Sequence, residues 1–140
     1  ADYDRIAAVN VRALFVATQA AAPHMGAGGR LVNIGSMVAD RAGSPGVALY
    51  AMSKAAVAGL TRGLARDLGP RGITVNNVQP GPTETEIVAD ESVRAYLRAQ
   101  IPVGRMGQDA EIAALVAYLV GAEAGYVNGA SLTIDGGFVA

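Results

Sequence analysis

The stretch RLVNIGSMVADRAGSPGVALYAMSKAAVAGLTRGLARDL, residues 30–68, contains the pattern of a strand, a loop and a long helix. Its opening run, RLVNIG, is apolar and has the length expected of a buried strand. A loop rich in Gly, Pro and Ser follows, and a helical pattern then extends from about residue 50 to residue 68. The sequence Gly-Pro-Arg-Gly at residues 69–72 ends this helix, so the stretch predicts one strand–helix unit.

Further elements lie on both sides of this unit. Residues 2–25 predict an amphipathic helix, because apolar residues such as Ile6 and Val9 recur at spacings of three and four. The glycines of MGAGG end that helix, since a phosphate-binding loop would instead follow a strand and open a helix. ITVNNV at residues 73–78 and SLTI at residues 131–134 predict two more strands.

The remaining segments are interpreted as a lid and a last helix. The turn Pro80-Gly81-Pro82 ends the second strand, and the polar, acidic stretch that continues to Gln100 is interpreted as a mobile lid. Asp109 is expected to cap a helix that runs to about residue 120.

Strands that alternate with helices of this length predict an α/β fold. Parallel neighbouring strands need crossover connections, and helices provide them, so the three strands are expected to form one parallel sheet with flanking helices. The chain has 140 residues, of which 51% are hydrophobic, which is enough to bury a core. Residues 1–140 are therefore interpreted as one unit.

The composition argues against several classes of function. The 11 basic and 12 acidic residues give a formal net charge of -1, and no Lys/Arg cluster of the kind that nucleic acids and anionic membranes select is present. No uninterrupted apolar run approaches the roughly 18 residues that span a bilayer. The chain has no cysteine and a single histidine, His24, so no metal site is predicted and a cytoplasmic location is expected.

Tyr50 and Lys54 stand four residues apart at the start of the predicted helix. Residues at this spacing lie on one face of a helix, so the two side chains can act together. An ammonium beside a phenol favours the phenolate, which would make Tyr50 a usable proton donor and acceptor. Lys54 is the only lysine in the chain, which indicates that a compact ammonium is required there. The spacing alone is equally typical of an ordinary surface pair.

Ser36 and Asn10 extend this candidate site. Ser36 directly follows the strand predicted at residues 30–35, at the edge where open α/β sheets bind their ligands, and its hydroxyl can hold a substrate oxygen. A loop serine more often caps nearby backbone. Asn10 interrupts the apolar helix pattern between Ile6 and Leu14, where an Asn is usually solvated or bonded to a neighbouring helix. Taken alone, these two residues leave both kinds of role open.

Four motifs together carry a resemblance to a known family: NIGS, YAMSK, NNVQPGPTETEI and, near the C-terminus, LTIDGG. Over nearly its whole length the chain resembles the short-chain dehydrogenase/reductase family, in particular its 3-oxoacyl-carrier-protein reductase-like branch. The resemblance implies the C-terminal part of a Rossmann-type doubly wound parallel sheet. It also implies an NAD(P)-dependent oxidoreductase that interconverts a carbonyl and a secondary alcohol by hydride transfer.

The same resemblance implies roles for individual residues. The family's catalytic tetrad matches Asn10, Ser36, Tyr50 and Lys54. Tyr50 would transfer the proton, Ser36 would bind the reacting oxygen, and Asn10 would hold a water that relays protons to the lysine. An NAD or NADP coenzyme would contact Tyr50, Lys54, Pro80, Gly81, Thr83 and Thr85. Glu84 and Glu86 are interpreted as solvated residues of the lid.

The family's coenzyme-binding half, with a Gly-rich turn for the pyrophosphate, normally comes first, and these 140 residues contain no such pattern. The chain is therefore interpreted as the catalytic C-terminal portion, and its start at Ala1 rather than Met fits a fragment or a processed form. A part of a larger subunit, a shortened form and a natural short variant all stay open. Small residues on both long helices, together with the resemblance, imply a homodimer or homotetramer.

Two other functions stay open. RGLARDLGPRGIT and VQPGPTET also resemble cyclic di-GMP-binding regulators of this family. Without the coenzyme-binding half, the chain could instead be a catalytically inactive fragment that acts only through assembly. For the enzyme, the expected partner is a small carbonyl or alcohol substrate, whose identity the sequence leaves open together with the choice between NAD and NADP.

Overall fold

Three parallel strands form the sheet of the protein, in the order β1 (Arg30–Ile34), β2 (Thr74–Pro80) and β3 (Ser131–Ile134). The structure is a computed structural model that describes residues 2–86 and 88–140, so Ile87 of the motif NNVQPGPTETEI lies outside it. Both strand pairs are parallel, with a register that joins Asn33 to Asn77. The predicted α/β fold with a parallel sheet of three strands is confirmed.

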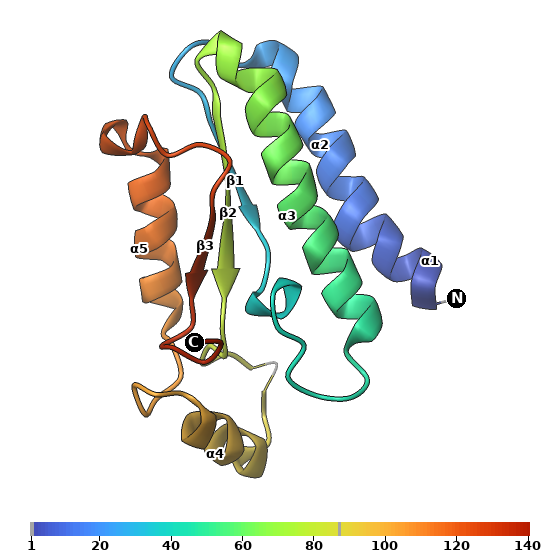
Figure 1. The fold of residues 1–140 in the computed structure, drawn as a ribbon, viewed down its shortest axis with the longest axis vertical. Helices are drawn as coiled ribbons and strands as arrows, with labels where there is room; N and C mark the ends of the chain where they lie inside the picture. Colours follow the sequence, from blue (N-terminus) through green and yellow to red (C-terminus); the bar gives the residue numbers. More distant parts are fainter. Residues whose placement is uncertain (1, 87) are drawn as a thin grey trace.

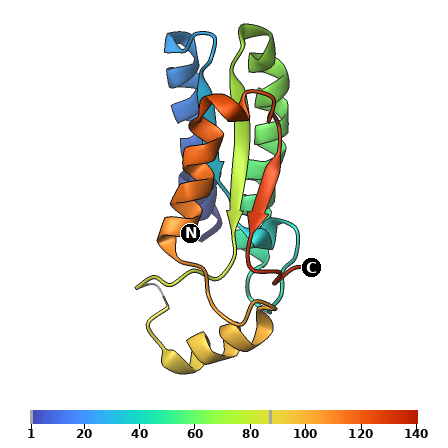
Figure 2. The ribbon, with the colours of Figure 1, turned by 90° about the vertical axis from the view of Figure 1, so that its left-hand side faces the viewer.

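Helices cover both faces of this sheet. The longer ones are α1 (Asp2–Ile6), the π-helix η1 (Ala7–Arg12), α2 (Ala13–Ala21), α3 (Ala48–Leu68), α4 (Glu91–Gln100) and α5 (Asp109–Val120). Short 3-10 turns are η2 (Ala22–His24), η3 (Met37–Ala39), η4 (Gly69–Arg71) and η5 (Ala122–Ala124). Figure 1 shows α3 on one face of the sheet with the N-terminal helices beside it, and α5 on the other face. Figure 2 looks onto α5, with the sheet and α3 behind it.

The central strand β2 packs against helices on both of its faces. Val75 is fully buried in a cluster with Ala65 and Leu68 of α3. Val78 is fully buried in a second cluster with Leu119 of α5. Because successive side chains of a strand point to opposite faces, these two valines bind one layer of helices to each side of the sheet.

The first predicted helix has the expected extent but contains an irregular turn. Residues 7–12, which include Asn10, form a π-helical turn between α1 and α2. A single wider turn shifts the helix phase by about one residue, which an apolar spacing of three and four tolerates. The sequence pattern therefore predicted a regular helix where the structure has a π turn, a feature that is frequent at functional sites.

Two features of the C-terminal half also differ from the prediction. The stretch interpreted as a mobile lid contains α4, which Asp90 caps by accepting a hydrogen bond from the Ser92 backbone N–H at 2.8 Å. The cap of α5 is Gln108 rather than Asp109, because Gln108 and Glu111 form a reciprocal capping box. Asp109 is instead the first residue of that helix.

The N-terminal helical run, Asp2–His24, is the one stretch of residues 2–86 and 88–140 that could cross a membrane by length and composition alone. Its mean hydropathy over the best window is 1.2, a finding that the search for uninterrupted apolar runs did not predict. This is weak evidence, since core helices of soluble proteins have similar length and composition. In the structure one side of the run packs against α3 and most of the rest is exposed.

The carboxyl ends of the strands meet at one edge of the sheet, because all three strands run in the same direction (Figure 1). The turn η3 follows β1 at this edge, and α3 begins there and runs back along the sheet. The ends of two strands and the start of a helix are thereby brought together, and this is the place where ligands bind in open α/β sheets.

Gly72 provides a test of the connection from α3 to β2. Its φ is +73°, a left-handed conformation, and a Cβ there would lie 3.2 Å from the Cα of Ala27. We expect Gly72→Ala to lower the free energy of unfolding by about 1–2 kcal/mol. The control is Gly26→Ala, at an exposed glycine without a left-handed φ and with open space around the new Cβ, which should change the free energy of unfolding by less than about 0.5 kcal/mol. Urea unfolding of the full-length gene product measures the change in stability of both variants. Equal changes would contradict a special requirement for glycine at position 72.

Candidate active site

An open cleft of about 760 Å³ lies at the carboxyl edge of the sheet. Its lining includes seven of the predicted site residues: Ser36, Tyr50, Lys54, Pro80, Gly81, Thr83 and Thr85. The opposite wall is one side of α5, which contributes Asp109, Ile112, Ala113, Val116 and Ala117. This wall could not be recognised from the sequence, because its apolar residues have the spacing of an ordinary core-facing helix.

Tyr50 and Lys54 lie together on the cleft side of α3. The Nζ of Lys54 is 5.6 Å from the centre of the Tyr50 ring, and it donates a hydrogen bond to the backbone oxygen of Ile34 at 3.1 Å. The Tyr50 side chain stays accessible, with 40% of its residue surface exposed. Partial burial lowers the pKa of the Lys54 ammonium below its usual value of 10.5. The end of β1 thus holds the ammonium beside the phenol.

Ser36 caps local backbone and lines the cleft at the same time. It is the N-cap of η3, and its Oγ accepts a hydrogen bond from the Val38 backbone N–H at a long 3.4 Å. Only 9% of its surface is exposed, and the residue is part of the cleft lining. A hydroxyl has two acceptor lone pairs and a rotatable proton, so this contact leaves capacity for a substrate oxygen.

Asn10 lies outside the cleft and contacts it through another side chain. Its Nδ2 donates to the Oγ of Ser53 at 3.1 Å, and that hydroxyl donates to the backbone oxygen of Tyr50 at 2.7 Å. Ser53 is fully buried. The π turn thus contacts the helix that carries Tyr50 and Lys54, whereas the water relay expected from Asn10 stays a prediction. Ser53 was not predicted as part of the site. Its position between Tyr50 and Lys54 in the motif YAMSK was the sequence feature that could have indicated it.

The segment from Pro80 to Thr85 is held close to the end of β3. A Cβ on Gly81 would lie 2.4 Å from the Cβ of Asp135, so only glycine fits at this position. The Gly81 N–H donates to the Ile134 backbone oxygen at 2.9 Å, and the Thr83 hydroxyl donates to the Gly81 oxygen at 3.0 Å. These contacts fix the course of the turn along the cleft.

Glu84 differs from its predicted place in a solvated lid. Its carboxylate accepts a hydrogen bond from Arg94 at 2.9 Å and lies 3.8 Å from the guanidinium of Arg98, so both arginines of α4 face it. Arg94 also donates to the backbone oxygens of Thr85 and Val88. The helix α4 is therefore attached to the same segment that lines the cleft.

A parallel α/β sheet with a cleft at its carboxyl edge is the arrangement of Rossmann-type nucleotide-binding proteins. The family model described as enoyl-(acyl carrier protein) reductase matches residues 1–139. A short-chain dehydrogenase from Burkholderia cenocepacia J2315, solved in complex with NADP, is 51% identical with a TM-score of 0.95; the match covers 99% of this chain and 57% of that one. The chain belongs to the short-chain dehydrogenase/reductase family.

Two curated relatives show the range of functions in similar proteins. The cyclic-di-GMP-binding biofilm dispersal mediator protein of Escherichia coli (strain K12) is 48% identical, over 98% of this chain and 58% of the relative. The (3R)-3-hydroxyacyl-CoA dehydrogenase of Rattus norvegicus is 42% identical, over 97% of this chain and 54% of the relative. The chain thus spans a little over half the length of the proteins that it resembles.

Ser53 offers a test of the contact between the π turn and α3. Ser53→Ala removes the bond to the Tyr50 oxygen and leaves the amide of Asn10 without its described partner. We expect the free energy of unfolding of the full-length gene product to fall by about 0.5–1.5 kcal/mol, the net contribution of a hydrogen bond, because Asn10 is only partly buried and water can replace its lost partner. Ser44→Ala, at an exposed loop serine, is the matched control and should have no such effect. An equally stable Ser53→Ala protein would show that this contact contributes nothing.

Proposed function

We propose that the protein containing this chain is an NAD(P)-dependent oxidoreductase that interconverts a carbonyl and a secondary alcohol, with Tyr50 as general acid and base. The observation that carries the proposal is the cleft that Ser36, Tyr50 and Lys54 share with the Pro80-Gly81 turn. The names of the relatives support it, since one is a hydroxyacyl-CoA dehydrogenase and another was solved with NADP.

The residues of the cleft suit the nicotinamide end of such a coenzyme. Hydroxyls and an ammonium line it, and a ribose and a carboxamide need such donors and acceptors. In the proposal Tyr50 and Lys54 hold the ribose, while Pro80, Gly81 and the two threonines lie beside the nicotinamide. When bound, the coenzyme supplies or accepts the hydride, chemistry that no side chain provides.

The proton is the part of the reaction that this chain provides. In reduction, the Tyr50 hydroxyl donates its proton to the carbonyl oxygen; in oxidation, the phenolate takes the proton from the alcohol. Ser36 donates a hydrogen bond to the same oxygen and orients it toward Tyr50. Lys54 places its ammonium 5.6 Å from the centre of the Tyr50 ring, and burial lowers the pKa of that ammonium, so its proton is easier to release than that of an exposed lysine.

Tyr50→Phe is the decisive test of this function. The variant keeps the ring and loses the proton, so the rate of carbonyl reduction by the full-length gene product should fall at least about 100-fold. NADPH should still bind, weakened at most about tenfold by loss of the Tyr50 contact with the ribose, and this remaining affinity separates a chemical defect from a folding defect. Tyr118→Phe, at an exposed tyrosine of α5, is the matched control and should retain activity. Unchanged reduction by Tyr50→Phe over a panel of 3-oxoacyl thioesters would end the proposal.

We also propose that the protein forms a homodimer through its N-terminal helices and α3. The supporting observation is an apolar groove of about 730 Å³ between these helices, lined among others by Tyr3, Phe15 and Met52, each at least 44% exposed. A homotetramer and the cytoplasmic location stay predictions.

A ligand-binding regulator is the second candidate function, which the 48% identity to the cyclic-di-GMP-binding protein of Escherichia coli favours. If this function applies, titration of the full-length gene product with cyclic di-GMP in a calorimeter should give saturable heat. GMP, at the same phosphate concentration, is the control for nonspecific binding of phosphate. The absence of heat at high cyclic di-GMP concentration would exclude the regulator and leave the oxidoreductase.

A further inference from the structure

The cleft wall at Thr83 is held from outside by one glycine, Gly107. Thr83 and Gly107 form an isolated parallel β-bridge. The Gly107 N–H donates to the Pro82 oxygen at 2.9 Å, and the Glu84 N–H donates to the Gly107 oxygen at 2.9 Å. The two bonds surround Thr83, so the direction of the peptide groups on each side of Gly107 determines where this wall stands.

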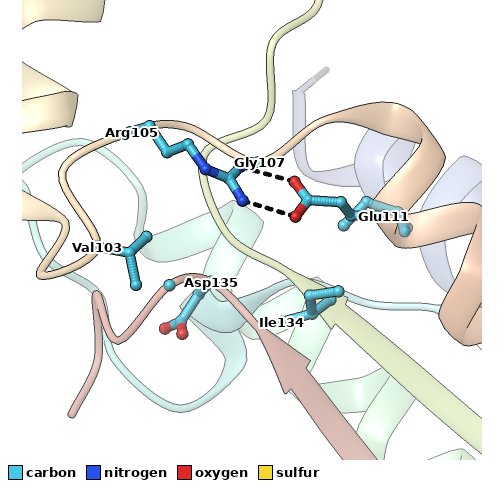
Figure 3. A pocket seen from close by; sticks show the side chains of 8 residues that line it. Val103, Arg105, Gly107, Glu111, Ile134 and Asp135 are labelled. Atoms are coloured by element: carbon cyan, nitrogen blue, oxygen red, sulfur yellow. Dashed lines mark hydrogen bonds and ion pairs between the residues drawn. The ribbon is translucent and has the colours of Figure 1, made fainter.

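An ion pair lies on the opposite side of Gly107. The guanidinium of Arg105 donates to both carboxylate oxygens of Glu111, each at 2.8 Å (Figure 3). Side chains of Val103, Ile134 and Asp135 surround the small hollow beside the pair, whose volume is about 250 Å³. Beside a hollow the turn at Arg105 makes few van der Waals contacts, so hydrogen bonds contribute more to its position.

Each partner of the pair also holds one of the two peptide groups that flank Gly107. Arg105 Nη1 donates to the Met106 oxygen at 3.1 Å, and Glu111 Oε2 accepts from the Gln108 N–H at 2.8 Å. In a planar trans peptide the C=O and N–H point in opposite directions. A fixed Met106 oxygen therefore aims the Gly107 N–H at Pro82, and a fixed Gln108 N–H aims the Gly107 oxygen at Glu84.

We infer that Arg105 and Glu111 are positioning residues for the coenzyme-facing wall of the cleft, acting through the two peptide groups that flank Gly107. The inference rests on the proposed function, because it assigns the pair to the wall where a nicotinamide coenzyme would bind. Neither residue touches the reacting atoms. Their effect is on the affinity for the coenzyme and much less on the chemical step.

The stability of an exposed ion pair does not explain this arrangement. The side chains of Arg105 and Glu111 are 55% and 41% exposed, and pairs of this kind contribute little to folding. A pair that only joined two surface elements would need the contact between guanidinium and carboxylate and no hydrogen bond to the backbone. Here each charge also makes a hydrogen bond to one of the two peptide groups that flank Gly107, which contacts the cleft wall.

The carboxylate of Glu111 is ionised at every pH at which the protein would work. The hydrogen bond from Arg105, followed by that from the Gln108 backbone, lowers the pKa of Glu111 to about 2 from the usual 4.5. Because the folded-state pKa is lowered, the contribution of this group is complete above about pH 4.5 and is lost as the pH falls toward 2. Coenzyme affinity between pH 5 and 9 should therefore not follow the titration of this pair.

The test compares Arg105→Met, Glu111→Ala and the exchanged pair Arg105→Glu/Glu111→Arg in the full-length gene product. The exchange restores opposite charges, but a carboxylate cannot donate to the Met106 oxygen and a guanidinium cannot accept from the Gln108 N–H. We expect all three to weaken NADPH binding and raise its KM about tenfold, the equivalent of one net hydrogen bond. The kcat at saturating NADPH should change less than about threefold. Glu91→Gln, which breaks the exposed pair with Arg98, is the matched control.

Hydrogen exchange provides a readout that needs no coenzyme. The Glu84 and Gly107 amides should exchange faster in the three variants, while the amides of β2 keep the protection of the parent and thereby show that the variants fold. Rescue by the exchanged pair would overturn the inference, because a simple ion pair would then suffice. Unchanged NADPH affinity and amide exchange in the variants would overturn it as well. A parent protein that binds no NADPH would overturn the proposed function itself and with it this inference.

Discussion

The common direction of the three strands is the constraint on which the rest of the structure depends. Because β1, β2 and β3 run parallel, their carboxyl ends meet at one edge, and each connection must return along the sheet. The helix α3 therefore begins where β1 ends, which places Tyr50 and Lys54 beside Ser36. The turn at Pro80 reaches the same edge from β2. The direction of the strands thus determines where the cleft lies, and the side chains determine its chemistry.

The elements that could be predicted are those whose apolar pattern is strong over several residues. The strand near residue 30 and the helix that ends at Leu68 belong to this group, because apolar residues recur through each of them at the spacing of its type of structure. The helix α4 does not, since contacts between charged side chains and the neighbouring segment hold much of it in place, including the bonds of Arg94. The π turn could not be predicted either, because one extra residue in a turn hardly changes the apolar spacing.

The residues of the candidate site also fall into those that could be predicted from the sequence and those that could not. Ser36, Tyr50 and Lys54 could be placed from the sequence, because each stands at the boundary of a predictable strand or helix. Asn10 could not, since its contact with Ser53 joins positions 43 residues apart and depends on how two helices pack. Arg105 and Glu111 are close in sequence, but their inferred role depends on the orientation of two peptide groups. A pattern of residue types does not reveal that orientation.

The single lysine of the chain allows the cleft to be labelled selectively. Lys54 carries the one side-chain amine among these 140 residues, and its Nζ lies at the end of β1 beside Tyr50. Because burial lowers its pKa, a larger share of this amine is uncharged and nucleophilic at mildly alkaline pH than for an exposed lysine. Within this chain an amine-selective acylating reagent would therefore find one side-chain amine to modify, and a fluorophore attached there would lie at the cleft.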